Sequence, residues 1–174
     1  MNIGMGYDPR ALANALLDIA DAERFAMTNL SLNKILYFIN SDSIAERGYK
    51  LSQLTFEAWQ YGPVLPLIYH QFKIHGSNHI TSRATKIDSK TGNEVIADYS
   101  DIEFETSYIK YRFNEYKIMS PGTLVALSHL PGSPWDLVWN GTAPNVGMKI
   151  TDDLILGYVK GSKIPGTDSD YVKH

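Results

Sequence analysis

Helix-start signals recur along this chain and constrain its fold more than any other feature. A capping residue followed by proline, a pair suited to the first turn of a helix, occurs at Asp8-Pro9, Ser120-Pro121 and Ser133-Pro134. The first pair predicts a helix over residues 8–24, and the other two predict short helices that end before Pro131-Gly132 and at Trp139. The chain has no regular alternation of strands and helices, which excludes a Rossmann fold or an α/β barrel.

Apolar spacing and capping residues predict three further helices. Leu32, Ile35, Leu36 and Ile39 form one helical face, in a segment that starts near Thr28 or Ser31 and stops at Gly48. Capping-box spacing at Ser100–Glu103 predicts the start of another helix, and Thr151 is expected to cap the last one.

The rest of the chain contains extended segments. Residues 54–58 alternate in polarity and predict a short strand or an extended turn, after which Gly62-Pro63 is expected to open a helix that ends at Gly76. Residues 80–97 predict a β-hairpin, because Ser89–Asn93 has the composition of a turn.

Together these elements predict an α+β, mainly α fold: a single compact helical domain with a small β-hairpin or sheet. The domain is expected over residues 1–160, with a loop at 140–147 and a polar tail at 161–174. No stretch approaches the ~18 apolar residues that span a bilayer, and the N-terminus lacks the cationic start of a signal peptide. We therefore expect a cytoplasmic protein that does not contact membranes.

Charge and cysteine content narrow the function. The 16 Lys and Arg against 19 Asp and Glu give a net charge of −3, which argues against direct binding to nucleic acid. The absence of Cys removes disulfides, thiolate metal sites and Cys nucleophiles. Eleven Tyr residues are a surplus that suits binding surfaces as well as a half-buried core.

Catalytic and metal signatures are missing. The chain has no nucleophile elbow, phosphate loop or dinucleotide loop. His75 and His79 are four residues apart, but Gly76 and Asn78 interrupt the helix that would align them on a metal. His129 lies at a predicted helix end, where we expect its ring to bond the last carbonyls or to gain from the helix dipole rather than to act in catalysis. We expect no enzyme, cofactor or metal site.

Two further segments have a structural and a functional interpretation. Lys34 lies beside an apolar helix face, where we expect its stem to pack and its ammonium to reach water, ahead of a specific ligand contact. In Phe56–Val64, Trp59 and Tyr61 precede Gly62-Pro63. A buried core corner is the first interpretation, and an aromatic anchor for a partner is the second.

The ordered blocks of this sequence resemble the Panacea domain family, also called the SocA-like antitoxin domain. The blocks lie between residues 7 and 159 and comprise Tyr7-Asp8-Pro9 with Ala13-Asn14 and Leu17, Leu30–Tyr37, Phe56–Val64, Ser128-His129 with Ser133-Pro134-Trp135, and Ile150 with Gly157-Tyr158. The block Phe56–Val64 is the most specific of them.

The resemblance implies an antitoxin of a toxin–antitoxin system, found often on phages and mobile elements. Its expected partner is a cognate protein toxin, neutralised by direct binding; one branch of the family delivers its toxin to the ClpXP protease as a proteolytic adaptor. The alternative is a phage or mobile-element accessory protein that binds a host or defence protein. Candidate partner-binding residues are Lys34, Tyr37, Trp59, Tyr61, Gly62, Pro63, Tyr69, His129 and Trp135. The oligomeric state stays open.

Overall fold

The computed structural model describes residues 2–141 and 146–161. Its α-helices are α1 (Pro9–Ala22), α2 (Asn29–Arg47), α3 (Pro66–Phe72), α4 (Thr106–Tyr116), α5 (Pro121–Ser128), α6 (Pro134–Trp139) and α7 (Asp152–Gly161). Its strands are β1 (Phe56–Trp59), β2 (Gly62–Val64), β3 (Thr85–Ile87), β4 (Glu94–Ile96) and β5 (Lys149–Ile150). Short 3₁₀ turns cover Lys73–His75, Ser100–Glu105 and Val146–Met148. The predicted mainly helical α+β class is confirmed.

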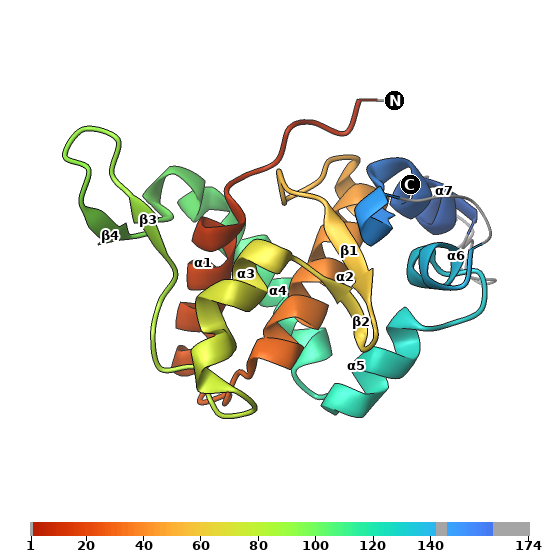
Figure 1. The fold of residues 1–174 in the computed structure, drawn as a ribbon, viewed down its shortest axis with the longest axis horizontal. Coiled ribbons are helices and arrows are strands. Elements are labelled where there is room, and N and C mark those ends of the chain that lie inside the picture. The colour runs from red at the N-terminus through yellow and green to blue at the C-terminus, as the bar shows by residue number, and fades with distance from the viewer. Residues whose placement is uncertain (1, 142–145, 162–174) are drawn as a thin grey trace, which may run out of the picture.

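Helix α2 is the centre of the fold. Figure 1 shows it with α1 and α3 on one side and with β1, β2 and α5–α7 on the other. Its N-cap Thr28 accepts the N–H of Ser31, and the left-handed Gly48 donates its N–H to the Ile44 carbonyl. Both predicted ends of this helix are therefore confirmed. Buried residues lie on most of the faces of this helix, so neighbouring elements pack against it on several sides.

The cap-and-proline signals also hold. The side chains of Asp8, Ser120 and Ser133 each accept a backbone N–H from the first turn of the helix that follows. The Leu154 N–H donates to Thr151 Oγ1 at 3.3 Å, so the last helix begins as expected. The predicted tail lies outside the described residues, except for Gly161, which ends α7. The centre of the predicted loop at 140–147 also lies outside the described residues.

The prediction that Gly62-Pro63 opens a helix is wrong. These residues form the edge strand β2 of an antiparallel sheet with the order β2-β1-β5, and α3 begins later, at Pro66. Trp59 pairs with Gly62 across a two-residue turn, and Ala58 pairs with Pro63. Proline has no N–H to give to a ladder, which an edge strand tolerates. Gly62 supplies the positive φ of 108° that the chain needs after the turn.

The predicted hairpin at 80–97 is confirmed as the shorter pair β3–β4, which projects from the α1 side of the molecule (Figure 1). Asn14 of α1 anchors it: its Nδ2 donates to the carbonyls of Ala84 and Ala97 at 3.0 and 2.8 Å, and its Oδ1 accepts the Ala84 N–H at 2.8 Å. The buried side-chain amide of Asn14 thus attaches the base of this polar hairpin to α1 by hydrogen bonds.

The capping box expected at Ser100–Glu103 is also wrong. Ser100 is the first residue of the turn and not its cap: Tyr99 occupies the cap position and makes no side-chain capping bond, while Asp98 accepts the N–H and the hydroxyl of Ser100 at 2.9 and 2.8 Å. Residues Ser100–Glu105 form a 3₁₀ turn, and α4 begins at Thr106. The buried faces of Ile109, Phe113 and Tyr116 lie on α4 as expected.

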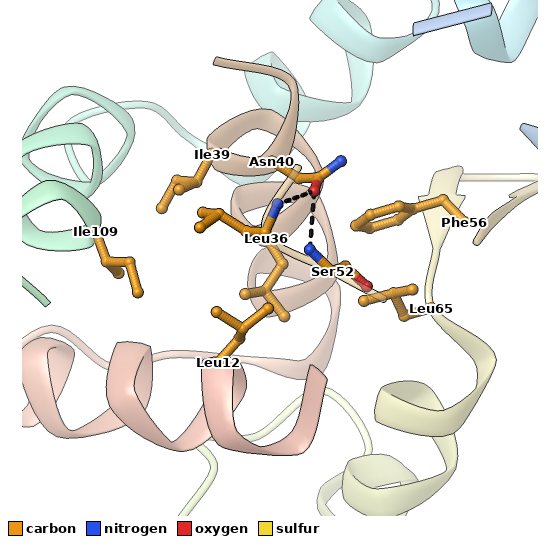
Figure 2. A pocket seen from close by; sticks show the side chains of 9 residues that line it. Leu12, Leu36, Ile39, Asn40, Ser52, Phe56, Leu65 and Ile109 are labelled. Atoms are coloured by element: carbon orange, nitrogen blue, oxygen red, sulfur yellow. Dashed lines mark hydrogen bonds between the residues drawn. The ribbon is translucent and has the colours of Figure 1, made fainter. Parts of the chain in front are cut away.

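The core contains a small cavity. It lies between α1, α2 and β1, measures about 10 Å³ and is lined mainly by apolar side chains (Figure 2). Asn40 borders it and accepts the backbone N–H groups of Leu51 and Ser52 at 2.9 and 3.0 Å. Such a volume holds about one water molecule at most. This cavity therefore has no room for a ligand larger than water.

Candidate functional site: an aromatic groove at the β1–β2 hairpin

Three aromatic side chains gather where the β1–β2 hairpin meets α3. The ring centroids of Trp59 and Tyr69 are 5.0 Å apart in an edge-on arrangement, and the Trp59 indole N–H donates to Glu57 Oε2 at 2.9 Å. Tyr61 stands at the hairpin turn and is 61% exposed. The buried core corner is therefore only half realised, because Trp59 is half-buried and Tyr61 faces solvent.

These rings border a surface groove of about 510 Å³, which we call the aromatic groove. The start of α2 forms one side of the groove. The hairpin, α3 and the turn that follows α3 form the other sides. Its lining includes Leu30, Lys34, Trp59, Tyr61, Tyr69 and Lys73. Amphipathic rings around a concave surface suit the docking of another protein.

Lys34 lies at the inner side of this groove, and the expectation that its ammonium reaches water is wrong. The residue is 0% exposed, and its Nζ donates to the Pro63 carbonyl at 2.9 Å. Burial lowers the pKa of the amine to about 7, because the charged form is poorly solvated there. The reason is tertiary: strand β2 covers the α2 face on which Lys34 lies.

Gly62 makes this close approach possible. A Cβ atom at this position would lie 2.6 Å from both Lys34 Cε and Ser128 Oγ. The neighbouring Asn33 adds a second bond between α2 and the strand end, since its Oδ1 accepts the Leu65 N–H at 3.0 Å. The conformation of the hairpin is thus fixed from α2 and α5.

Helix α6 holds the hairpin from a third direction. The Trp135 indole N–H donates to the Trp59 carbonyl at 2.7 Å. The Trp135 ring stacks on His129 with centroids 3.5 Å apart and planes inclined by 11°. The backbone of Trp59 is therefore held by α6, while Trp59 also lines the groove.

His129 ends α5 as predicted, but it bonds the helix through its backbone N–H, to the carbonyls of Val125 and Ala126. Its ring stacks on Trp135 instead of reaching those carbonyls. Burial and the nearby charge of Lys34 hold the pKa of His129 below its ordinary value. Its Nε2 is buried and has no hydrogen-bond partner within the described residues.

The structure brings all but one of the predicted partner-binding residues to this hairpin: Lys34, Trp59, Tyr61, Gly62, Pro63, Tyr69, His129 and Trp135. The exception is Tyr37, which is 4% exposed and packs edge-on against Phe38 and Phe56 in the core. Tyr37 therefore lies apart from the others and away from solvent.

Sequence reasoning missed Leu30, Asn33 and Lys73 as part of this surface. Asn33 and Leu30 lie in the same block as Lys34, and that proximity is the only signal that could have pointed to them. Lys73 has no sequence signal, because only the path of the chain after α3 brings it to the groove.

The histidine pair considered for a metal is used otherwise. His75 Nε2 and Ser82 Oγ are 2.8 Å apart, and His79 Nε2 lies 3.5 Å from Asp21 Oδ1. Within residues 2–141 and 146–161, no three His, Cys, Asp or Glu side chains come together as a metal site. Over the same residues, no helix is long and apolar enough to cross a bilayer.

Comparison with known proteins adds the relationship. Antitoxin SocA of Caulobacter vibrioides (strain NA1000 / CB15N) is 36% identical over 159 residues, which cover 90% of this chain and 85% of that protein. No solved structure matches the chain. The family model described as "Antitoxin SocA-like, Panacea domain" matches residues 32–136, a range that includes the β1–β2 hairpin, Lys34 and Trp135. This chain belongs to the SocA-like antitoxin family, the proteins of the Panacea domain.

Proposed function

We propose that this protein is an antitoxin that neutralises a cognate protein toxin by binding it directly, with the aromatic groove as the contact surface. The observation that carries the proposal is the exposure of Tyr61 at the rim of a groove walled by Trp59 and Tyr69, in a member of an antitoxin family. Tyr and Trp are the residue types most enriched among those that dominate binding energy.

The rigidity of the hairpin supports the same conclusion. Lys34, Asn33 and Trp135 each fix a backbone group on or beside it, and Gly62 packs directly against Lys34 and Ser128. A surface that is already ordered loses less conformational entropy when it binds. The backbone that carries Trp59 and Tyr61 is thus held in one arrangement before a partner arrives.

In this proposal neutralisation is stoichiometric, takes place in the cytoplasm and needs no chemical step, cofactor or metal. The toxin is occluded for as long as the complex lasts. Family membership, and the relative named Antitoxin SocA, support this role.

Co-expression with the neighbouring gene tests the proposal. The neighbouring gene product should arrest growth alone, the wild-type antitoxin should restore growth, and Tyr61→Ala should restore it less. Tyr111→Ala is the matched control, because Tyr111 is also exposed but lies on α4, outside the groove. A neighbouring gene product that is harmless, or whose toxicity the wild type leaves unchanged, would contradict the proposal.

The same strains also test a proteolytic-adaptor role and an alternative function as an accessory protein. If the protein also delivers its toxin to a ClpXP-type protease, as a proteolytic adaptor does, toxin levels should fall on co-expression only in cells that contain the protease. If it is instead a phage or mobile-element accessory protein, a host or defence protein should bind the groove in place of the neighbouring gene product, again with dependence on Tyr61.

A further inference from the structure

The register of the β3–β4 hairpin determines which of its main-chain groups point outward. The Ala97 N–H donates to the Ala84 carbonyl at 2.9 Å. The Asp88 N–H donates to the Asn93 carbonyl at 2.8 Å. Opposite residues of an antiparallel ladder alternate between hydrogen-bonded and non-hydrogen-bonded pairs, and the second kind direct their N–H and C=O groups away from the partner strand. The residues of the second kind are Thr85 and Ile87 on β3 and Glu94 and Ile96 on β4.

The outer edge of β3 faces the helices and is partly occupied. Figure 1 shows β3 on the side of the hairpin that is nearer to α1 and α3. The side-chain amide of Gln71, on α3, accepts the Thr85 N–H at 3.0 Å and donates to the Thr85 carbonyl at 3.4 Å. Gln71 thus binds both outward groups of Thr85, as a neighbouring strand would, and only Ile87 keeps outward groups on this edge.

The outer edge of β4 is open. All three residues of this strand are exposed. In the part of the chain that the structure describes, no hydrogen bond reaches the outward main-chain groups of Glu94 and Ile96. These two residues therefore direct two donors and two acceptors to solvent, at the spacing of a β-strand. An exposed edge of this kind is a template for the main chain of another extended segment.

The side chains on one face of the hairpin determine what pairs well with β4. Ile87, Glu94 and Ile96 lie on the same face, and the two isoleucines are 64% and 63% exposed. The Glu94 carboxylate accepts the Thr85 hydroxyl at 2.6 Å and forms no ion pair with a described residue. A strand beside β4 is therefore favoured by an apolar residue opposite Ile96 and by Lys or Arg opposite Glu94.

We propose that the outer edge of β4 binds an extended segment of another protein, which adds to the hairpin as a third, antiparallel strand and carries an apolar residue followed two positions later by Lys or Arg. In such complexes main-chain bonds provide affinity, and alternate side chains provide specificity. A third strand also extends a two-stranded ladder, which is marginally stable alone. The described residues that line the aromatic groove lie outside this hairpin, so the inference does not rest on the proposed toxin contact.

A randomised library of displayed nine-residue peptides tests the inference, with the full-length chain as bait. The Glu94→Pro variant serves for counter-selection, because proline removes the outward N–H and leaves the ladder bonds between β3 and β4 in place. Peptides that bind the aromatic groove are retained by both proteins and are discarded. Those retained by the wild type alone should contain an apolar residue followed two positions later by Lys or Arg. Retained peptides without this pattern, or no retained peptide, would overturn the inference.

N-methylation of one retained peptide distinguishes strand addition from contact through side chains alone, and it uses only the wild-type protein. The peptide residues opposite Glu94 and Ile96 are expected to direct their N–H groups to β4. Methylation of either N–H should weaken binding about tenfold, and methylation of the residue between them should have little effect. Fluorescence anisotropy measures the affinities. Equal effects at all three positions would overturn the inference.

Two matched variants locate the site on the protein. Ile87 stands directly opposite Glu94, so Ile87→Pro removes an outward N–H from the other edge of the same hairpin. Glu94→Pro should weaken peptide binding about tenfold, and Ile87→Pro should change it little. Glu94→Lys keeps every main-chain group and should weaken binding about fivefold at low salt and less at high salt. Equal effects of the two proline variants, with both folded by circular dichroism, would overturn the inference.

Discussion

The ammonium of Lys34 donates a 2.9 Å hydrogen bond to the carbonyl oxygen of Pro63, and this bond joins the N-terminal part of α2 to the edge strand of the β1–β2 hairpin. The contact is possible because residue 62 has no side chain. A lysine that would ordinarily face water is thereby turned into a support for the turn that carries Tyr61. The arrangement has consequences for stability that can be measured independently of any toxin.

The first prediction concerns pH. The folded-state pKa of Lys34 is about 7, well below its ordinary value of 10.5. Between these two values the unfolded chain binds more protons at this site than the folded chain, so stability rises as pH increases. We expect the free energy of unfolding to increase by about 3 kcal/mol between pH 7 and pH 9.5. Denaturant titrations at fixed pH values measure it.

The control is Lys34→Met, which keeps the length of the side chain and removes the titrating group. Its stability should be nearly constant over the same window. Work above pH 10 is avoided, because the raised pKa of Tyr7 and Tyr99, about 12 in each case, makes the folded state lose stability there. A rise in the Lys34→Met variant equal to that of the wild type would assign the effect to other groups.

The second prediction concerns Gly62. Gly62→Ala places a Cβ at 2.6 Å from Lys34 Cε and Ser128 Oγ, at a φ of 108° that side chains rarely adopt. We expect a loss of about 2–4 kcal/mol in the free energy of unfolding.

Gly92→Ala is the matched control, because Gly92 also has a positive φ, of 72°, but a Cβ there would meet nothing within 4 Å. It should lose about 1 kcal/mol. Chemical denaturation of the two variants side by side gives the comparison. Equal losses would mean that backbone strain alone, and not contact with Lys34 and Ser128, explains the glycine.

The parts of the fold that could be predicted from the sequence are those determined by residues that lie close together along the chain. The start of α2 at Thr28 and its end at Gly48 are local signals, and so are Ser120-Pro121 and Ser133-Pro134; all four were predictable. The capping box at Ser100 was wrong because the turn begins one residue earlier, so that Tyr99 occupies the cap position and Ser100 lies inside the turn, bonded to Asp98.

The site itself was predictable only in part. The residues Phe56–Val64 drew notice through their aromatic content, but the strand at Gly62-Pro63 and the buried amine of Lys34 arise from one contact between segments 29 residues apart in the chain. Tyr37 and Tyr61 are the same residue type in similar blocks, yet one packs in the core and the other faces solvent. Only the tertiary arrangement distinguishes them.

The third prediction concerns the α6 support. Trp135→Phe removes the indole N–H that bonds the Trp59 carbonyl at 2.7 Å and keeps an aromatic ring against His129. We expect a loss of about 1–2 kcal/mol in unfolding free energy and faster dissociation of the toxin, because the hairpin is held less firmly. Trp139→Phe, on the same helix and more exposed, is the control. Surface plasmon resonance measures the dissociation rate. An unchanged rate in Trp135→Phe would show that the bond from α6 does not contribute to binding at the groove.

The fourth prediction tests a buried carboxylate outside the groove. Glu105 is 1% exposed and accepts hydrogen bonds from Arg47 Nη1, Tyr7 OH and Tyr49 OH at 2.7, 3.0 and 3.2 Å. Glu105→Ala leaves Arg47 without its carboxylate partner and should cost about 3–5 kcal/mol of stability, with Glu105→Gln less damaging. Neither change should alter toxin affinity in the fraction that remains folded. A selective loss of affinity in Glu105→Gln would place the binding surface on this side of the molecule instead.

The most direct test of the central claim is the affinity of the purified toxin complex, measured by isothermal titration calorimetry with folded variants. Tyr61→Ala should raise the dissociation constant about 30-fold, which corresponds to about 2 kcal/mol for an aromatic anchor in the contact, and Tyr111→Ala should leave it unchanged. The opposite pattern, with full affinity in Tyr61→Ala or an equal loss in Tyr111→Ala, would contradict the aromatic groove as the surface that binds the toxin.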